Sequence, residues 1–194
     1  IFYRSESLFN DDDLTTASQI LIQQDGNYQY LLATEAVTAT IIDGGDRKWL
    51  GTSGSGVYVL SDDGLTIEHQ FSTENSPLPS NNILDIAINQ ANGEVFIATS
   101  RGTISYLGEA SNWDSEMSDI FVFPNPVEVG YEGVITVDGL DFETTVHVTD
   151  GSGRLVAKVE SMGGRAVWDG RFDSGLLAPY GVYLIFAVDR DGKT

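Results

Sequence analysis

Cysteine is absent from this chain of 194 residues, which excludes disulfides, thiolate metal sites and cysteine nucleophiles. Basic residues are also few, since 10 Lys and Arg face 29 Asp and Glu, for a formal net charge of −19. A chain without a basic stripe cannot displace phosphate counterions, so we expect no nucleic-acid partner. No apolar run reaches the roughly 18 residues of a membrane helix, so we expect no transmembrane segment either.

Residues typical of catalytic and metal centres are equally scarce. The only histidines, His69 and His147, have no ligand-like spacing, which predicts no metal site. The acidic run Asp11–Asp13 lacks the alternating, glycine-interrupted pattern of a calcium loop, so we expect a solvated loop. The chain contains no nucleophile elbow and no dinucleotide fingerprint. We therefore expect no catalytic residue, no cofactor and no enzymatic activity.

Short runs of Ile, Val, Thr and aromatic residues, separated by Asp-Gly and Asn-Gly turns, dominate the chain and predict an all-β fold. No stretch shows the 3.6-residue period of a helix. The expected strands are Gln19–Ile22, Tyr28–Ala33, Val37–Ile42, Lys48–Thr52, Gly56–Leu60, Ile83–Ile88, Glu94–Thr99, Thr103–Tyr106, Phe121–Phe123, Val134–Val137, Thr145–Thr149, Leu155–Val159, Arg165–Trp168 and Gly181–Val188.

The front part repeats itself with an offset of about 46 residues, so that Trp49 matches Phe96 and Thr52 matches Thr99. The repeat resembles the blades called two-component-regulator propeller repeats. This resemblance implies a partial β-propeller of about two to three blades, including a degenerate copy at about Phe2–Thr34. A closed propeller needs at least about four blades, so we expect an open array.

A polar stretch without periodicity divides the chain. We predict blades over residues 1–110, a linker over 111–119 and a second domain over 120–194. Trp113 in the linker is expected to pack against a domain face. The second domain has six strand candidates, and Val146 and Val148 should face inward while His147 faces outward. This pattern predicts an immunoglobulin-like β-sandwich. After Asp191-Gly192 a turn begins, where a seventh strand is expected.

Four short motifs follow one another in the second domain, at Phe123–Val127, Asp150–Val156, Gly163–Gly170 and Gly181–Tyr183. Together they resemble the C-terminal sorting domain of the type IX secretion system, which carries proteins across a bacterial outer membrane. The prolines should start the sandwich at an edge, the glycines should occupy turns or bulges, and Trp168 should anchor the core. The motif residues are Pro124, Asn125, Pro126, Gly153, Arg154, Gly163, Gly164, Trp168, Asp169, Gly170, Gly181 and Tyr183.

Blades followed by a sorting-type domain resemble a surface component of that secretion machinery. The resemblance implies a non-catalytic, outer-membrane-associated protein of the attachment complex at the cell surface. Its implied partners are a sortase-like peptidase and outer-membrane barrel proteins, and it would take part in attaching anionic lipopolysaccharide to cargo. Two alternatives stay open: a secreted cargo with a cleavable sorting domain, and the periplasmic sensor of a hybrid two-component system. Because the chain opens inside an expected strand at Ile1–Tyr3, we expect a C-terminal piece of a longer protein, with its targeting signal upstream.

Overall fold

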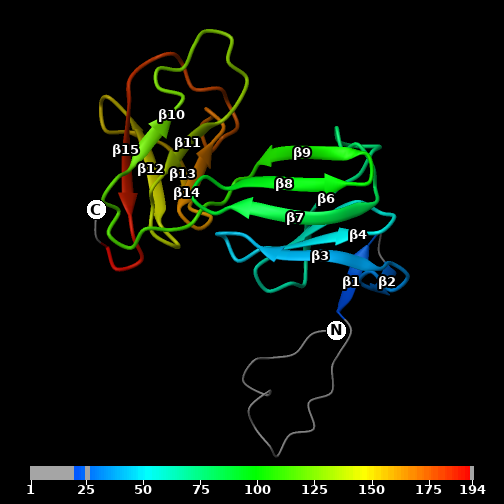
Figure 1. Ribbon diagram of the computed structural model, residues 1–194. Coiled ribbons are helices and arrows are strands. Elements are labelled where there is room, and N and C mark those ends of the chain that lie inside the picture. The colour runs from blue at the N-terminus through cyan, green and yellow to red at the C-terminus, as the bar shows by residue number, and fades with distance from the viewer. Residues whose placement is uncertain (1–19, 25–26, 193–194) are drawn as a thin grey trace, which may run out of the picture. The chain divides into compact units, whose positions relative to one another are not determined.

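The computed structural model describes residues 20–24 and 27–192, and within them the chain is all-β, as the sequence predicts. None of the described residues belongs to a helix that could cross a membrane. The strands, shown in Figure 1, are β1 (Leu21–Gln24), β2 (Asn27–Tyr30), β3 (Val37–Ile42), β4 (Lys48–Thr52), β5 (Val57–Leu60), β6 (Ile67–Phe71), β7 (Ile83–Asn89), β8 (Glu94–Thr99), β9 (Gly102–Leu107), β10 (Phe121–Phe123), β11 (Ile135–Asp138), β12 (Thr145–Asp150), β13 (Leu155–Glu160), β14 (Arg165–Trp168) and β15 (Tyr183–Val188).

The chain divides into two compact units. The first runs up to Ile41 and continues with Arg47–Ile86 and Ile97–Ile104, and the second comprises Ile42–Asp46, Ala87–Phe96 and the chain from Ser105 onward. The predicted acidic loop Asp11–Asp13 and most of the predicted degenerate blade lie outside the described residues. The described part of that blade forms the two-stranded sheet β1-β2.

A four-stranded meander in the order β3-β4-β5-β6 forms most of the first unit. Its centre is apolar, because Trp49, Val57 and Val59 are buried. The sequence missed strand β6, whose residues between Ile67 and Phe71 are all polar or charged. The strand forms because its backbone pairs with β5, which supplies the hydrogen-bond partners that its side chains do not suggest.

The next sheet, in the order β7-β8-β9, repeats a local hydrogen bond of the meander. The hydroxyl of Thr52 donates to the carbonyl of Gly56 over 2.8 Å, and the hydroxyl of Thr99 donates to the carbonyl of Gly102 over 2.7 Å. The matched threonines therefore make the same kind of hydrogen bond, to a glycine four residues later in the first copy and three residues later in the second.

Two three-stranded sheets in the second unit, β10-β11-β14 and β13-β12-β15, share one apolar core. We call this pair of sheets the sandwich. Val146 and Val148 are fully buried in it while His147 is half-buried on the other face of β12, as predicted. The buried core residues are Val137, Leu140, Val146, Val148, Val156, Ala157, Ala166 and Trp168.

The predicted linker 111–119, between β9 and β10, is not uniformly exposed to solvent. Ser111 is 1% exposed, whereas Trp113, which was expected to pack on a domain face, is 54% exposed, so that expectation is wrong. The physical reason is the backbone around it. The amide of Asn112 donates to the carbonyl of Gln90 and that of Asp114 to the carbonyl of Leu140, which leaves the intervening indole turned toward solvent.

Candidate interaction site

The paired registers bring most of the motif residues to one end of the sandwich. Ile135 faces Trp168, and Asp150 faces Tyr183. The loops 124–134 and 169–182 and the turn 151–154 therefore leave the sandwich at the same end, which we call the motif end. Trp168, which is 4% exposed, lies inside this end, as expected of a core anchor.

Trp168 and Tyr183 join the two sheets at the motif end. Their rings meet edge to face, with centroids 5.3 Å apart and planes inclined by 66°. The indole Nε1 of Trp168 donates a hydrogen bond of 2.7 Å to the carbonyl of Arg171, and the Tyr183 hydroxyl donates to the carbonyl of Pro179. Both aromatic residues therefore bury their rings in the sandwich while their polar atoms hold the loop 169–182.

The turn between β12 and β13 is organised by Asp150. Its carboxylate accepts hydrogen bonds from the amide and hydroxyl of Ser152, over 2.9 and 2.6 Å, and from Nε of Arg154, over 3.1 Å. These bonds, led by the Ser152 hydroxyl, lower the pKa of Asp150. Gly153 completes the turn at a φ of +84°, which side chains disfavour. The Arg154 guanidinium lies 5.7 Å from the ring centre of Phe172, so the turn also contacts the loop 169–182.

The remaining motif residues of this end differ in what they do. Asp169 accepts a hydrogen bond of 3.0 Å from the amide of Arg171, and Gly170 has a φ of +75°. Gly181 lies in a bend just before β15, but it has neither a positive φ nor any atom within 4 Å of an added Cβ, so nothing at this bend requires a glycine.

Pro124, Asn125 and Pro126 follow strand β10 directly and begin the loop 124–134. Both of the X-Pro peptide bonds are cis. β10 is an edge strand, since it pairs only with β11 in its sheet. The prolines therefore directly follow and end β10, the edge strand with which the sandwich begins.

Gly163 and Gly164 lie at the opposite end of the sandwich, against the chain that follows β9. A Cβ added to Gly163 would lie 2.2 Å from the carbonyl oxygen of Ser111 and 2.3 Å from that of Gly44, and one added to Gly164 would lie 2.1 Å from that of Asn112. The amide of Gly164 donates to the Ser111 carbonyl over 2.8 Å. These two glycines are required by close backbone packing, which is a stronger constraint than a turn alone.

A buried polar cluster that sequence reasoning did not predict lies next to these glycines. Arg165 and Asp138 form an ion pair whose side chains are 3% and 7% exposed. The Ser111 hydroxyl donates to Asp138 over 2.7 Å, and the Arg165 guanidinium donates to the carbonyl of Gly108 over 2.8 Å. The guanidinium also lies 5.9 Å from the ring centre of Phe123. The cluster ties β11 and β14 to the chain after β9 and has no exposed reactive group.

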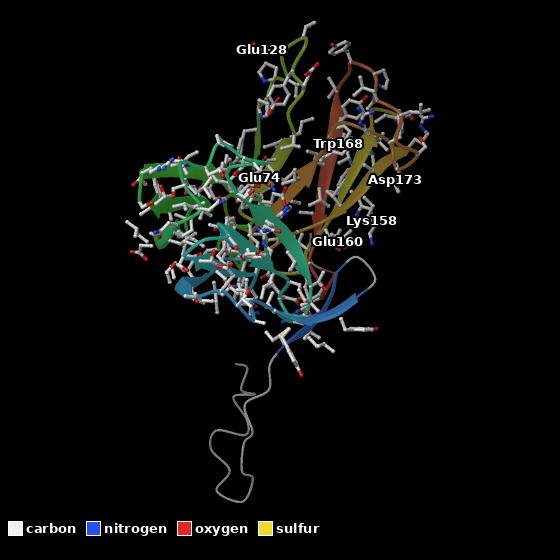
Figure 2. All side chains as sticks on the ribbon, turned by 90° about the vertical axis from the view of Figure 1, so that its right-hand side faces the viewer. Glu74, Glu128, Lys158, Glu160, Trp168 and Asp173 are labelled. Carbon is white, nitrogen blue, oxygen red and sulfur yellow. The ribbon has the colours of Figure 1, made fainter. Side chains whose placement is uncertain are left out.

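Charged side chains on the outer face of β13 form a second polar group. Lys158 and Glu160 lie side by side in Figure 2, with 2.8 Å between Nζ and Oε1. Two hydrogen bonds lower the pKa of Glu160. The bond from Lys158 has the larger effect, and the bond from the Thr145 hydroxyl comes next. Both side chains are exposed, so solvent screens the pair and its contribution to stability is small.

An open pocket of about 460 Å³ lies beside β13 and the loop after β14. Val159, Val167 and Trp168 line it, together with Arg171 and Asp173. The charged residues of its rim are engaged locally: Arg171 donates to the carbonyl of Gly175 over 3.0 Å, and Asp173 accepts from the amide of Lys158 over 3.3 Å. These contacts fasten the loop onto the free edge of β13.

The two histidines lie on strands of different units, His69 on β6 and His147 on β12, where His147 is paired with Lys158 of β13. Within the described part of the chain, no three His, Asp or Glu side chains gather closely enough to hold a metal ion. The residues that the structure brings together are thus aromatic, glycine and ion-paired groups. Such an arrangement can pack and dock.

Comparison with solved structures shows a similarity over nearly the whole chain. The chain is similar to PorZ, described as an essential bacterial surface component of the type IX secretion system of Porphyromonas gingivalis, with 32% identity and a TM-score of 0.62. The match covers 98% of this chain and 26% of the PorZ chain, so the chain spans about a quarter of that protein. No protein-family model and no curated protein matches the sequence.

Two further structures are similar at a much lower level. Both are described as the extracellular domain of a regulatory system of B. thetaiotaomicron, one a one-component and the other a hybrid two-component system. They are 12% identical with a TM-score of 0.32, and they cover 89% and 95% of this chain and 26% and 28% of theirs. This level of similarity carries no argument for or against the sensor alternative.

Proposed function

We propose that this chain is part of a PorZ-like surface component of the type IX secretion system, and that it acts by docking, without catalysis. The match to PorZ over 98% of the chain, at 32% identity, carries this proposal. The finer architecture belongs to it as well: the sheets β3–β6 and β7–β9 are propeller blades, and the sandwich is an immunoglobulin-like sorting-type domain. The repeated Thr-to-Gly hydrogen bond supports the blades, and the shared apolar core supports the domain.

The partners and the place of action follow from the same resemblance. We propose that the chain acts outside the cytoplasm, in an outer-membrane-associated complex with a sortase-like peptidase and barrel proteins, during attachment of lipopolysaccharide to cargo. The motif end supports a docking role, because Trp168 and Tyr183 hold its loops to the core.

A chimera tests the proposal directly. The matching quarter of P. gingivalis PorZ is replaced by this chain, and secretion of type IX cargo to the cell surface is measured in a strain lacking PorZ. We expect secretion to be restored by the chimera and not by the same chimera carrying Trp168→Ala. A chimera that reaches the surface in folded form and restores no secretion would contradict the proposal.

The cargo alternative rests on one specific observation, the sorting-type motif itself. In cargo, the domain would be removed after export, whereas a machinery component would retain it. The two readings therefore differ in the C-terminal mass of the surface form, with clipping near Ser118–Phe121 expected only for cargo.

A further inference from the structure

The sandwich is packed against a stretch of chain that precedes its first strand. This stretch, residues 108–114, follows β9 and belongs to the same compact unit as the sandwich, and we call it the strap. Its middle is closed to solvent, since Ala110 is 2% exposed and Ser111 is 1% exposed. The strap is therefore one side of a packed interface, and it does more than connect two domains.

The strap is fixed to an earlier part of the chain, the turn between β7 and β8. The amide of Gly108 donates to the carbonyl of Gly93, and the amide of Asn112 donates to the carbonyl of Gln90, both over 2.9 Å. Gly93 has a φ of +69°, and a Cβ added to it would lie 2.1 Å from the carbonyl oxygen of Ala110. The strap and this turn thus pack backbone against backbone, within one unit.

Side chains of the buried polar cluster form the first part of the contact between the strap and the sandwich. The Ser111 hydroxyl donates to Asp138 over 2.7 Å, and the Arg165 guanidinium donates to the Gly108 carbonyl over 2.8 Å. The side chains of Arg165 and Asp138 are 3% and 7% exposed. Hydrogen bonds to charged groups that are shielded from water are stronger than bonds between neutral groups. Both bonds therefore hold the strap firmly to the sandwich.

Backbone groups form the second part of the contact. The Gly164 amide donates to the Ser111 carbonyl, and the Asp114 amide donates to the Leu140 carbonyl, both over 2.8 Å. Ser111 also pairs with Gly163 in a parallel β-bridge. Together with the two side-chain bonds, four hydrogen bonds join the strap to the sandwich.

The exposed part of the linker comes after the strap. Every residue from 115 to 120 except Met117 is exposed, and exposed chain is where endopeptidases cut. The strap precedes this stretch, and the sandwich residues that the strap binds follow it. A cut here therefore breaks the covalent chain and none of the four hydrogen bonds. We propose that the strap holds the sandwich as a noncovalent partner, so that the sandwich stays in place after such a cut.

The strap fits its partner by shape as well as by hydrogen bonding. A Cβ added to Gly163 would lie 2.2 Å from the carbonyl oxygen of Ser111, and one added to Gly164 would lie 2.1 Å from that of Asn112. The surface of the strap thus accepts a sandwich in which two glycines precede the buried Arg165. Cleavage of the linker and loss of the domain are then separate events, and loss requires that the strap be displaced.

Cutting the folded, full chain tests the proposal. The recognition sequence of a site-specific protease is inserted between Ser118 and Asp119, the protein is cut, and the products are compared with the uncut protein by gel filtration. We expect the two pieces to elute together at micromolar concentration and to separate only in denaturant. Separation of the pieces under native conditions would overturn the proposal.

Two serine variants test whether the strap is what holds the sandwich. In Ser111→Ala the cut pieces should bind each other at least about tenfold more weakly, because a hydrogen bond to the buried Asp138 carboxylate is lost. Ser152→Ala is the matched control, since it removes a hydroxyl bonded to the more exposed Asp150 in the β12–β13 turn and should leave binding unchanged.

Native mass spectrometry of the cut variants over a dilution series measures the dissociation constants, and circular dichroism of the uncut variants establishes that both fold. Equal binding in the two variants would overturn the role assigned to the strap, whereas weaker binding in Ser111→Ala alone supports it. None of these results bears on the secretion assay of the chimera, so the two proposals fail separately.

Discussion

Trp168 on β14 and Tyr183 on β15 meet edge to face across the sandwich, with ring centroids 5.3 Å apart. They come from two motifs that are separated in the sequence by the loop 169–182, and their polar atoms hold that loop at both of its ends. The motif end is thus a packing unit that positions exposed loops. This geometry yields predictions that separate packing, ion pairing, backbone fit and titration.

Replacing the buried indole tests the packing. Trp168→Ala should lower the free energy of unfolding of the sandwich by about 3–5 kcal/mol, because it leaves a cavity and removes the edge-to-face contact. Chemical denaturation measures this loss. Trp113→Ala, which alters an indole that is 54% exposed, should cost less than about 1 kcal/mol. Similar losses in both variants would contradict the assigned burial.

The ion pair between Arg165 and Asp138 should be costly to break. Arg165→Met leaves the Asp138 carboxylate buried without its cation, and the free energy of unfolding should fall by about 3–5 kcal/mol. The exposed pair of Arg154 and Asp150 supplies the comparison, and Arg154→Met should cost no more than about 1 kcal/mol. Equal losses of stability in the two arginine variants would contradict the burial of the ion pair between Arg165 and Asp138.

Replacement by alanine should destabilise the chain strongly at one motif glycine and hardly at all at another. Gly163→Ala forces a side chain into a φ of +61° and against the carbonyls of Ser111 and Gly44, so we expect a loss of at least about 2 kcal/mol. Gly181→Ala meets open space and should change stability by less than about 0.5 kcal/mol. Thermal unfolding of both variants measures the contrast, and a larger effect at Gly181 would reverse the assignment.

Titration of Asp150 tests the turn between β12 and β13. Its pKa is lowered in the folded chain, chiefly by the Ser152 hydroxyl, so its contribution to stability is present above the ordinary aspartate pKa and is lost as the pH falls through the lowered value. Ser152→Ala should raise the pKa of Asp150 toward its ordinary value. Carbon NMR of the carboxyl group follows this shift, and an unchanged pKa would exclude Ser152 as its cause.

The sequence predicted the strands well where apolar residues alternate or cluster, as at Lys48–Thr52 and Arg165–Trp168. It missed β6, because Glu68, His69 and Gln70 look like surface residues and only pairing with β5 makes them a strand. The local sequence pattern carries no information about such pairing between strands.

The motif glycines show the same limit at the site. Sequence reasoning assigned Gly163 and Gly181 one common role, yet one lies against two carbonyl oxygens and the other lies in open space. Arg165 was missed because a charged residue between a glycine pair and an apolar run reads as an exposed strand end. Its partner Asp138 comes before a glycine and reads as part of a turn. Only the fold brings the two together, 27 residues apart.

The central claim is that this chain is a retained, non-catalytic component of the cell-surface machinery. The most direct measurement is the C-terminal mass of the protein taken from the surface of its own cells. The account predicts a form in which β10–β15 remain attached to the preceding chain, with no lipopolysaccharide joined to a new terminus. A surface form that ends near Ser118–Phe121 would contradict the account and assign the chain to cargo.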